Sequence, residues 1–179
     1  MTRYKQLVVN TFILIFMLIF FSCTREKVTE GKKNIQNPKK SLEEVNKLLV
    51  EKDSERIKSY VERRGWAMRK SESGLWFMIY QEGTGNLVKK NDYITFNYEV
   101  NLLDGTKCYS SEESGPKSFV VGKGGVESGL EEGVLLLKKG SKARFILPPH
   151  LAHGLIGDEN RIPARATIIY DIEILEINQ

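Results

Sequence analysis

The amino-acid sequence predicts an α+β domain in which an antiparallel sheet of about five to six strands curls around one short helix, after an N-terminal helical arm. The first observation is the alternation of apolar and polar residues in several short segments, which is typical of strands with one buried face. The second is that strand and helix patterns do not alternate regularly, which argues against a parallel sheet. The third is a single short helical pattern inside the strand-rich region.

Residues 122–149 organise this domain. Glycines end an apolar run, a helical pattern follows, and an alternating strand stops at a pair of prolines. Leu130, Val134 and Leu137 give the helix one narrow apolar face. Because so short a helix is marginal alone, we expect it to pack on the flanking strands, with the loop before it lining a pocket.

The expected strands are each bounded by turn-forming residues, and they are residues 75–81, 93–103, 107–111, 118–121, 141–147 and 167–178. Every second residue from Ile94 to Leu102 is apolar, so these side chains share one face of their strand. Asp104 and Gly105 then predict a hairpin turn.

The length suits one domain with an extension. Residues 1–22 have a positive start and an apolar stretch that is shorter than a transmembrane helix, which is typical of a secretory signal. Cys23 follows directly, and Phe20, Phe21 and Ser22 before it resemble the lipobox of Bacteroidetes lipoproteins. This resemblance implies a lipoprotein signal peptide, cleavage before Cys23 and lipidation of that residue. The alternative is an uncleaved signal-anchor.

The residues after Cys23 bear on localisation. Thr24 is not the aspartate that retains enterobacterial lipoproteins in the inner membrane, and residues 25–27 lack the acidic run of a surface-export tag. The pattern therefore favours a periplasm-facing outer-membrane lipoprotein of a bacterial envelope. Residues 23–40 are basic and poor in apolar residues, so we expect a flexible tether that is solvated or lies on anionic lipid headgroups.

Residues 41–65 are predicted to form the helical arm. Ser41 and Glu44 fit a capping box, and Gly65 ends an apolar stripe of helical spacing. Asp53 and Ser54 are a candidate break that would divide the arm into two helices. The stripe either packs on the domain that follows, residues 66–179, or associates with a second copy to form a homodimer.

Charge and cysteine content exclude some functions. The net charge is +4, and removal of residues 1–22 lowers it to +2 with no clustered basic patch, so nucleic-acid binding is not expected. If Cys23 is lipidated, Cys108 remains alone and the mature chain has no internal disulfide. His150 and His153 are three residues apart in a loop without a cysteine partner, so we expect no metal site.

An ordered set of short phrases between residues 70 and 178 resembles the FKBP family of peptidyl-prolyl isomerases. The phrases are residues 74–75, 83–85, 88–92, 97–98, 103–105, 110–111, 129–133, 139–140, 149–154 and 162–171. The N-terminal region with Gly65 and Trp66 also resembles the gliding-motility-associated FKBP-type lipoproteins of Bacteroidetes. The resemblance implies an FKBP-like fold and peptidyl-prolyl cis-trans isomerase (rotamase) activity on proline-containing polypeptide clients, without cofactor or metal.

The resemblance also implies where the site lies. Five residues match the family's catalytic pocket, either by side chain or by the backbone N–H at Glu127 that holds a substrate carbonyl: Tyr98, Val126, Glu127, Ile162 and Tyr170. Four further residues are expected to contact the substrate: Tyr109, Phe119, Leu130 and His153. For Phe119 a role in the core alone is an equal alternative.

Several of these positions depart from the family pattern. Leu130 stands where the family has the tryptophan floor of the pocket, Cys108 and Tyr109 replace a Phe-Asp pair, and His153 replaces a tyrosine. Two hypotheses therefore remain open. The first is an envelope-anchored isomerase of reduced or selective activity that assists the folding of exported proteins. The second is an FKBP-fold chaperone or assembly factor for an envelope complex, such as one for motility.

Overall fold

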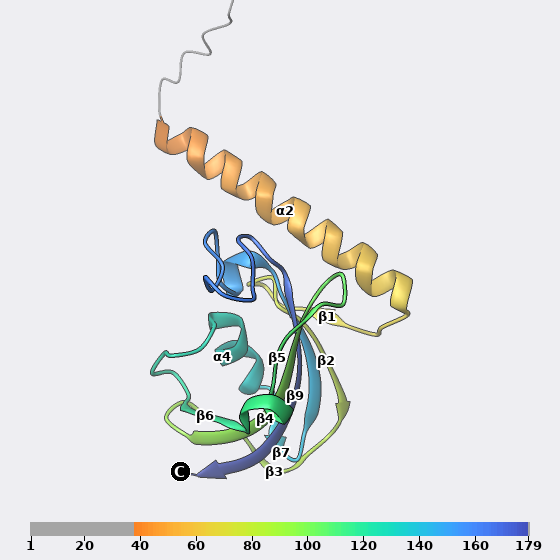
Figure 1. Ribbon diagram of the computed structural model, residues 1–179, viewed down its shortest axis with the longest axis vertical. Helices are drawn as coiled ribbons and strands as arrows, with labels where there is room; N and C mark the ends of the chain where they lie inside the picture. The colour runs from red at the N-terminus through yellow and green to blue at the C-terminus, as the bar shows by residue number, and fades with distance from the viewer. Residues whose placement is uncertain (1–37, 179) are drawn as a thin grey trace, which may run out of the picture. The chain divides into compact units, whose positions relative to one another are not determined.

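A computed structural model describes residues 38–178 (Figure 1). The predictions for residues 1–37, namely the signal peptide, lipidation of Cys23 and most of the tether, lie outside these residues. The helices are α2 (Pro38–Arg64), α3 (Ser111–Ser114), α4 (Ser128–Val134) and the 3-10 turn η1 (Pro149–Leu151). The strands are β1 (Arg69–Lys70), β2 (Trp76–Gln81), β3 (Thr84–Leu87), β4 (Tyr93–Leu102), β5 (Lys107–Ser110), β6 (Lys117–Val120), β7 (Lys138–Lys139), β8 (Lys142–Leu147) and β9 (Ile168–Asn178).

The main sheet has the strand order β1-β2-β8-β9-β4-β5, and β6 pairs with β4 beyond the end of β5. All of its strand pairs are antiparallel, and β3 and β7 form a small second sheet. The predicted α+β fold class is thus confirmed. The main sheet holds seven strands rather than five to six, because the two residues of β1 are too few to show a period along the sequence.

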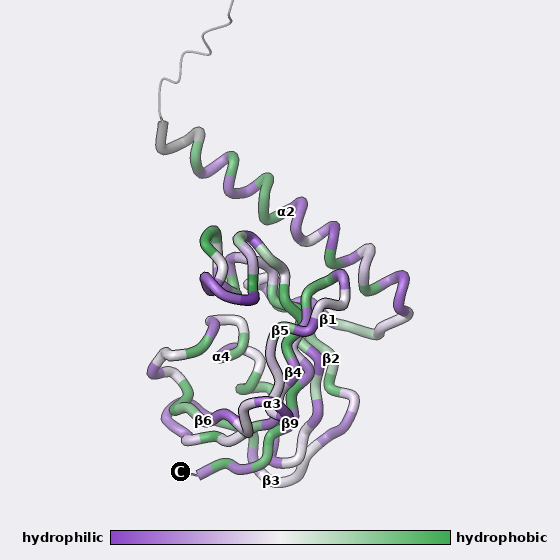
Figure 2. The backbone as a smooth tube through the Cα atoms, in the orientation of Figure 1, coloured by the Kyte–Doolittle hydropathy of each residue, from purple (hydrophilic) through white to green (hydrophobic). Residues whose placement is uncertain are grey.

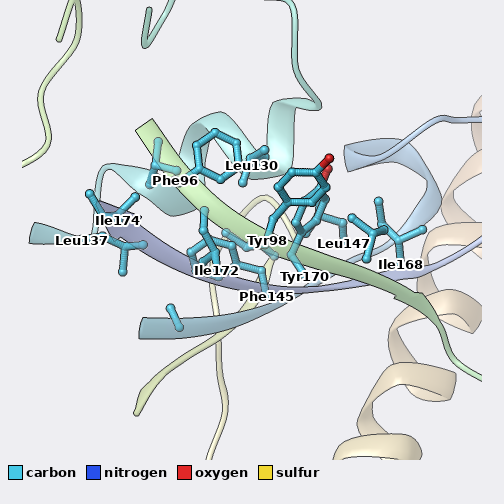
Figure 3. Packing of buried hydrophobic residues seen from close by; sticks show 14 of the residues in the cluster. Phe96, Tyr98, Leu130, Leu137, Phe145, Leu147, Ile168, Tyr170, Ile172 and Ile174 are labelled. Atoms are coloured by element: carbon cyan, nitrogen blue, oxygen red, sulfur yellow. The ribbon is translucent and has the colours of Figure 1, made fainter. Parts of the chain in front are cut away.

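Successive side chains of the central strands point to opposite faces of the sheet, and both faces are buried. Phe145, Leu147 and Tyr170 point into the main core, whereas their neighbours Ile146 and Ile169 belong to a second cluster. Figure 3 shows the main core, in which Leu130 of α4 lies over the aromatic and aliphatic side chains of β4, β8 and β9. The sheet therefore has an apolar layer on each side, one made with α4 and the other with α2.

Helix α2 is one unbroken helix and differs from the prediction at its start. It begins at Pro38 instead of Ser41, since proline is well accepted in the first turn, and it continues through Asp53 and Ser54. Hydrophilic and hydrophobic residues alternate along it (Figure 2). Its last turns place three buried side chains, Ile57, Tyr60 and Val61, against the sheet. Within residues 38–178, none of the helices combines the length and the apolar character needed to cross a bilayer.

Helix α4 is shorter than the apolar pattern suggested. It ends at Val134, and the chain continues in tight turns in which Leu136 N–H and Leu137 N–H donate to carbonyls three residues earlier. Leu137 is fully buried although it lies outside the helix. A Cβ atom at Gly133 would lie 2.6 Å from the Phe145 ring, so glycine is what allows α4 to approach β8 so closely.

Candidate functional site

A cavity of about 510 Å³ opens between α4 and the face of the sheet that carries the main core. Its size is within the range of small-ligand sites. The residues that line it come from β4, β6, the loop before α4, α4, the loop after η1 and β9: Phe96, Lys117, Ser118, Phe119, Gly125, Val126, Glu127, Leu130, Ala152, His153 and Tyr170.

Aromatic side chains of the central strands form one wall. The Phe96 ring packs edge-on against Phe119, with 5.8 Å between the ring centroids, and lies 5.9 Å from Tyr98. The centroids of Tyr98 and Tyr170 are 6.5 Å apart, and their hydroxyl groups point the same way (Figure 3). Because β4 and β9 are neighbours with a fixed register, this wall is part of the rigid sheet.

Helix α4 and the loop before it form the opposite side. Leu130 is buried on the first turn of α4, and Val126 packs against the core from the preceding loop. The glycines of this loop, such as Gly124 and Gly125, have positive φ angles, which residues other than glycine rarely adopt. The loop can therefore reverse direction and present Val126 and Glu127 to the cavity.

Glu127 and Tyr170 form a polar pair within the cavity, among both apolar and polar lining residues. The Tyr170 hydroxyl donates a hydrogen bond to Oε1 of Glu127 at 3.0 Å. Burial, together with the negative charge of Glu127, raises the pKa of Tyr170, so the phenol stays protonated and acts as a donor. Glu127 is the N-cap residue of α4, and among the described residues no group accepts a hydrogen bond from its backbone N–H. That N–H is available to a substrate carbonyl.

His153 lies beside this pair. Its Nε2 atom is 2.9 Å from Oε1 of Glu127, but the two groups do not have the alignment of a hydrogen bond. His150, by contrast, points elsewhere, with its Nε2 atom 2.9 Å from the carbonyl oxygen of Ser73. Within residues 38–178, no three His, Cys, Asp or Glu side chains gather in a way that would hold a metal ion.

Tyr98 is not among the lining residues, and its position is fixed at its hydroxyl. That group is 2.8 Å from the Oγ atom of Ser114 in α3, and the Lys117 ammonium lies 4.8 Å from the centroid of the Tyr98 ring. The distance suits a cation–π contact. Tyr98 therefore supports the aromatic wall, while Lys117 forms the rim of the cavity beside it.

Tyr109 is not part of the cavity lining and instead fastens the loop that carries His153. Its hydroxyl donates to Oδ2 of Asp158, and this bond raises the pKa of Tyr109. Asp158 also accepts the backbone N–H groups of Asn160 and Ile162. Although burial alone would raise the pKa of Asp158, these three hydrogen bonds together lower it.

Two further residues are buried beneath this loop. Ile162 belongs to the main core and does not line the cavity. Cys108 is fully buried, with Sγ 3.5 Å from the carbonyl oxygen of Arg161, and burial raises the pKa of its thiol. Arg161 in turn donates to the Cys108 carbonyl at 2.7 Å and to Glu113 at 3.0 Å. This corner is a structural joint between β5, α3 and the loop.

The structure brings six of the nine predicted site residues together around the cavity: Phe119, Val126, Glu127, Leu130, His153 and Tyr170. Tyr98, Tyr109 and Ile162 lie outside the lining, in the positions described above. Lys117 and the inward-pointing carboxylate of Glu127 were not anticipated. Lys117 was missed because β6 begins one residue before the predicted strand, and a lysine beside an apolar pocket has no signal in hydrophobic periodicity.

Comparison with known proteins adds an independent observation. Residues 85–175, about half of the chain, match the family described as FKBP-type peptidyl-prolyl cis-trans isomerase. A crystal structure of AtFKBP13 superposes with a TM-score of 0.59 at 30% identity, and the match covers 61% of this chain and 97% of that one.

Three curated relatives match over stretches of 92 to 159 residues. The FKBP-type peptidyl-prolyl cis-trans isomerase FkpA of Aeromonas hydrophila is 33% identical over 159 residues, which is 84% of this chain and 58% of the relative. FkpA of Escherichia coli is 34% identical over 111 residues, which is 62% of this chain and 40% of the relative. Human FKBP9 is 38% identical over 92 residues, 51% of this chain and 16% of the relative. The chain thus spans less than two thirds of the length of these relatives.

Proposed function

The chain belongs to the FKBP-type peptidyl-prolyl cis-trans isomerase family, and we propose that it catalyses the cis–trans isomerisation of X-Pro bonds in polypeptide clients within the cavity at α4. The observation that carries this proposal is the cavity itself, which joins an aromatic wall to a free backbone donor at Glu127. Both features arise from the part of the chain that matches the family.

Isomerisation of an X-Pro bond requires no reactive side chain from the protein. Rotation about an X-Pro amide has a barrier of about 18–20 kcal/mol because the C–N bond has partial double-bond character. The twisted amide loses this resonance and its charge separation, so a pocket of low polarity favours it over the planar form. Phe96, Phe119 and Leu130 supply such surroundings, and the Glu127 N–H would hold the carbonyl before the proline. This route uses no nucleophile, metal or cofactor.

A protease-free exchange assay on X-Pro peptides, followed by NMR, tests the proposal. Tyr170→Ala should lower kcat/KM by about tenfold or more, because it opens the aromatic wall of the cavity. Tyr80→Ala is the matched control, since Tyr80 lies on the main sheet in β2, half exposed and outside the cavity lining. Turnover indistinguishable from buffer for every peptide would refute the isomerase proposal.

The second candidate is a chaperone or assembly factor that binds clients without efficient catalysis. The observation that favours it is the exposed apolar pair Leu155 and Ile156, 69% and 72% exposed, on the loop that begins at the cavity rim. Suppression of client aggregation that survives Tyr170→Ala but is lost in a Leu155→Ser, Ile156→Ser variant would support this candidate.

For localisation, we propose a lipid anchor at Cys23 and a periplasm-facing position on the outer membrane, where the protein would assist the folding of exported proteins or the assembly of a motility complex. The support is the sequence pattern of residues 1–24. Metabolic labelling with palmitate should mark the wild-type chain and not Cys23→Ser. Equal labelling of the two would overturn the anchor.

For self-association, we propose a homodimer through the first half of α2. In the part of the chain that the structure describes, this half carries Leu42, Val45 and Leu48 at 48–64% exposure, and the apolar cluster at the other end of the helix does not include them. Such uncovered apolar side chains are typical of an interface. Light scattering should report a dimer that becomes a monomer in Leu42→Glu, Leu48→Glu. A wild-type monomer at high concentration would refute the proposal.

A further inference from the structure

The carboxylate of Glu127 is unusual in its placement. A side-chain oxygen at an N-cap position commonly accepts a hydrogen bond from the first turn of its helix. Glu127 caps α4 through its backbone position alone, and its side chain makes no such bond. It turns instead toward the cavity, where only 12% of it is exposed.

The neighbours of this carboxylate engage one of its two oxygens. The Tyr170 hydroxyl donates to Oε1 at 3.0 Å, and the Nε2 atom of His153 lies 2.9 Å from the same atom. Within residues 38–178, no hydrogen bond or ion pair is made to Oε2. The hydrogen bond from Tyr170 thus holds the carboxylate in place, with His153 beside it, while Oε2 remains able to accept a donor.

The rest of the cavity does not neutralise this charge by direct contact. Phe96, Phe119, Val126 and Leu130 are apolar. The ammonium of Lys117 is turned toward aromatic rings, 4.8 Å from the centroid of Tyr98 and 5.9 Å from that of Tyr109. The cavity therefore presents a negative oxygen on the α4 side, in surroundings where little water screens it.

We infer that Glu127 is a specificity-determining residue and that the site prefers X-Pro segments with a lysine or arginine immediately before or after the proline. This inference rests on the isomerase function proposed above. A cationic side chain can donate to Oε2 and gains Coulomb energy in the shielded cavity, whereas an acidic side chain meets repulsion and an aliphatic one gains neither.

A different role for Glu127 would be purely structural, as the acceptor that orients Tyr170. Glu127→Gln separates the two roles, because the glutamine carbonyl can still accept the Tyr170 hydroxyl while the negative charge is lost. A purely structural carboxylate predicts an unchanged ranking of substrates in this variant. If Glu127 determines specificity, the variant should lose its preference among the substrates.

The experiment measures kcat/KM by protease-free NMR exchange on the full chain, with tetrapeptides that carry Lys, Leu or Glu before the proline and a second series with these residues after it. In at least one series, the wild type should favour Lys over Glu by roughly tenfold. Glu127→Gln should bring this ratio close to one. Glu112→Gln removes the same charge from α3, outside the cavity, and should leave the ratio unchanged.

Lys117→Gln provides a second variant that does not alter Glu127. The positive charge of Lys117 repels a cationic substrate side chain, so Lys117→Gln should raise the Lys-to-Glu ratio. A fall in the ratio would count against the inference. A wild type that processes all peptides at equal rates overturns the inference and leaves the isomerase function standing. So does a Glu127→Gln variant that keeps the wild-type ratio.

If no peptide is turned over, the isomerase proposal fails and the preference is read from binding instead. Isothermal titration of the same peptides should then rank Lys above Glu for the wild type and not for Glu127→Gln. Equal affinities would overturn the inference in this case too. Thermal unfolding of every variant checks that it is folded.

Discussion

Helices α4 and α2 cover opposite faces of one sheet by different means. Helix α4 has seven residues, four of them buried, and glycines that let its backbone touch the strands. Helix α2 has 27 residues, yet its core contacts come from Ile57, Tyr60 and Val61 near its end. Burial per residue, and not helix length, therefore decides how firmly each helix is bound to the sheet.

The first prediction concerns Gly133 in α4. A Cβ atom there would meet three ring carbons of Phe145 at 2.6–2.9 Å, and that ring is fully buried and cannot withdraw. Gly133→Ala should lower the free energy of unfolding by about 3 kcal/mol, the upper end of typical overpacking costs. Urea denaturation measures this, with Leu135→Ala just beyond the helix as control. A neutral result would mean that α4 is less tightly seated than described.

The second prediction tests the attachment of α2. Ile57 is fully buried between the helix and the sheet. Ile57→Ala should cost about 2 kcal/mol, the lower end of the range for this substitution, because a helix on the outer face of the sheet can shift to close the cavity. Lys47→Ala, at an exposed position of the same helix outside the apolar residues of the proposed dimer interface, should change stability by no more than about 0.5 kcal/mol. Equal effects at both positions would contradict the division of α2 into a bound and an uncovered half.

The third prediction uses pH to test the α4 face of the sheet. Hydrogen bonds to the Asp158 carboxylate hold the loop beside α4, so protonation of this carboxylate should weaken that face. The pKa of Asp158 is lower in the folded chain, so its contribution to stability is present above the unfolded pKa of about 3.9 and is lost as pH falls through the folded value. Asp158→Asn should cost about 1–2 kcal/mol at pH 7, and the difference from wild type should shrink below about pH 4.

Denaturation across this pH range checks the third prediction. Glu159→Gln, the next residue along the loop, is the control and should track the wild type at every pH. A cost of Asp158→Asn that stays constant from pH 7 to pH 3 would show that the carboxylate charge does not hold the loop.

The fourth prediction concerns the point where α2 passes from its bound half to its uncovered half. Nη2 of Arg165 lies 2.8 Å from Oδ2 of Asp53 in a partly exposed ion pair. Asp53→Asn should therefore cost less than about 1 kcal/mol, and less still at high salt. A double-mutant cycle with Arg165→Gln isolates the coupling. A value well above this range would extend the bound half of α2 toward its start.

Much of the fold could be predicted because it depends on local periodicity. Alternation in β4 and β9 located the central strands to within a residue or two, and the spacing of Leu130 and Val134 located α4. The start of α2 was wrong because a capping pattern at Ser41 competes with a proline that suits a first turn equally well. The end of α4 was wrong because an i, i+7 apolar residue can be buried from a turn as well as from a helix.

The site was harder to predict because side chains on the same face of a strand do not all reach the cavity. The aromatic period along β4 does not distinguish Phe96, which lines the cavity, from Tyr98, which packs near Phe96 and Tyr170 but is not part of the lining. Tyr109 was expected at the substrate and fastens a loop instead, since its partner Asp158 is 49 residues away along the chain. No local pattern reports such a pairing.

The pairing of β4 with β9 has a consequence for how the molecule acquires its site. These strands bring Val100 opposite Tyr170 and Tyr98 opposite Ile172, so the aromatic wall consists of segments that are far apart along the chain. Contacts of this kind form only after a long loop has closed, which makes them slow compared with local ones. A nascent chain that has not yet released residues 168–178 for pairing therefore has no cavity, and the activity should appear in a single late step of folding.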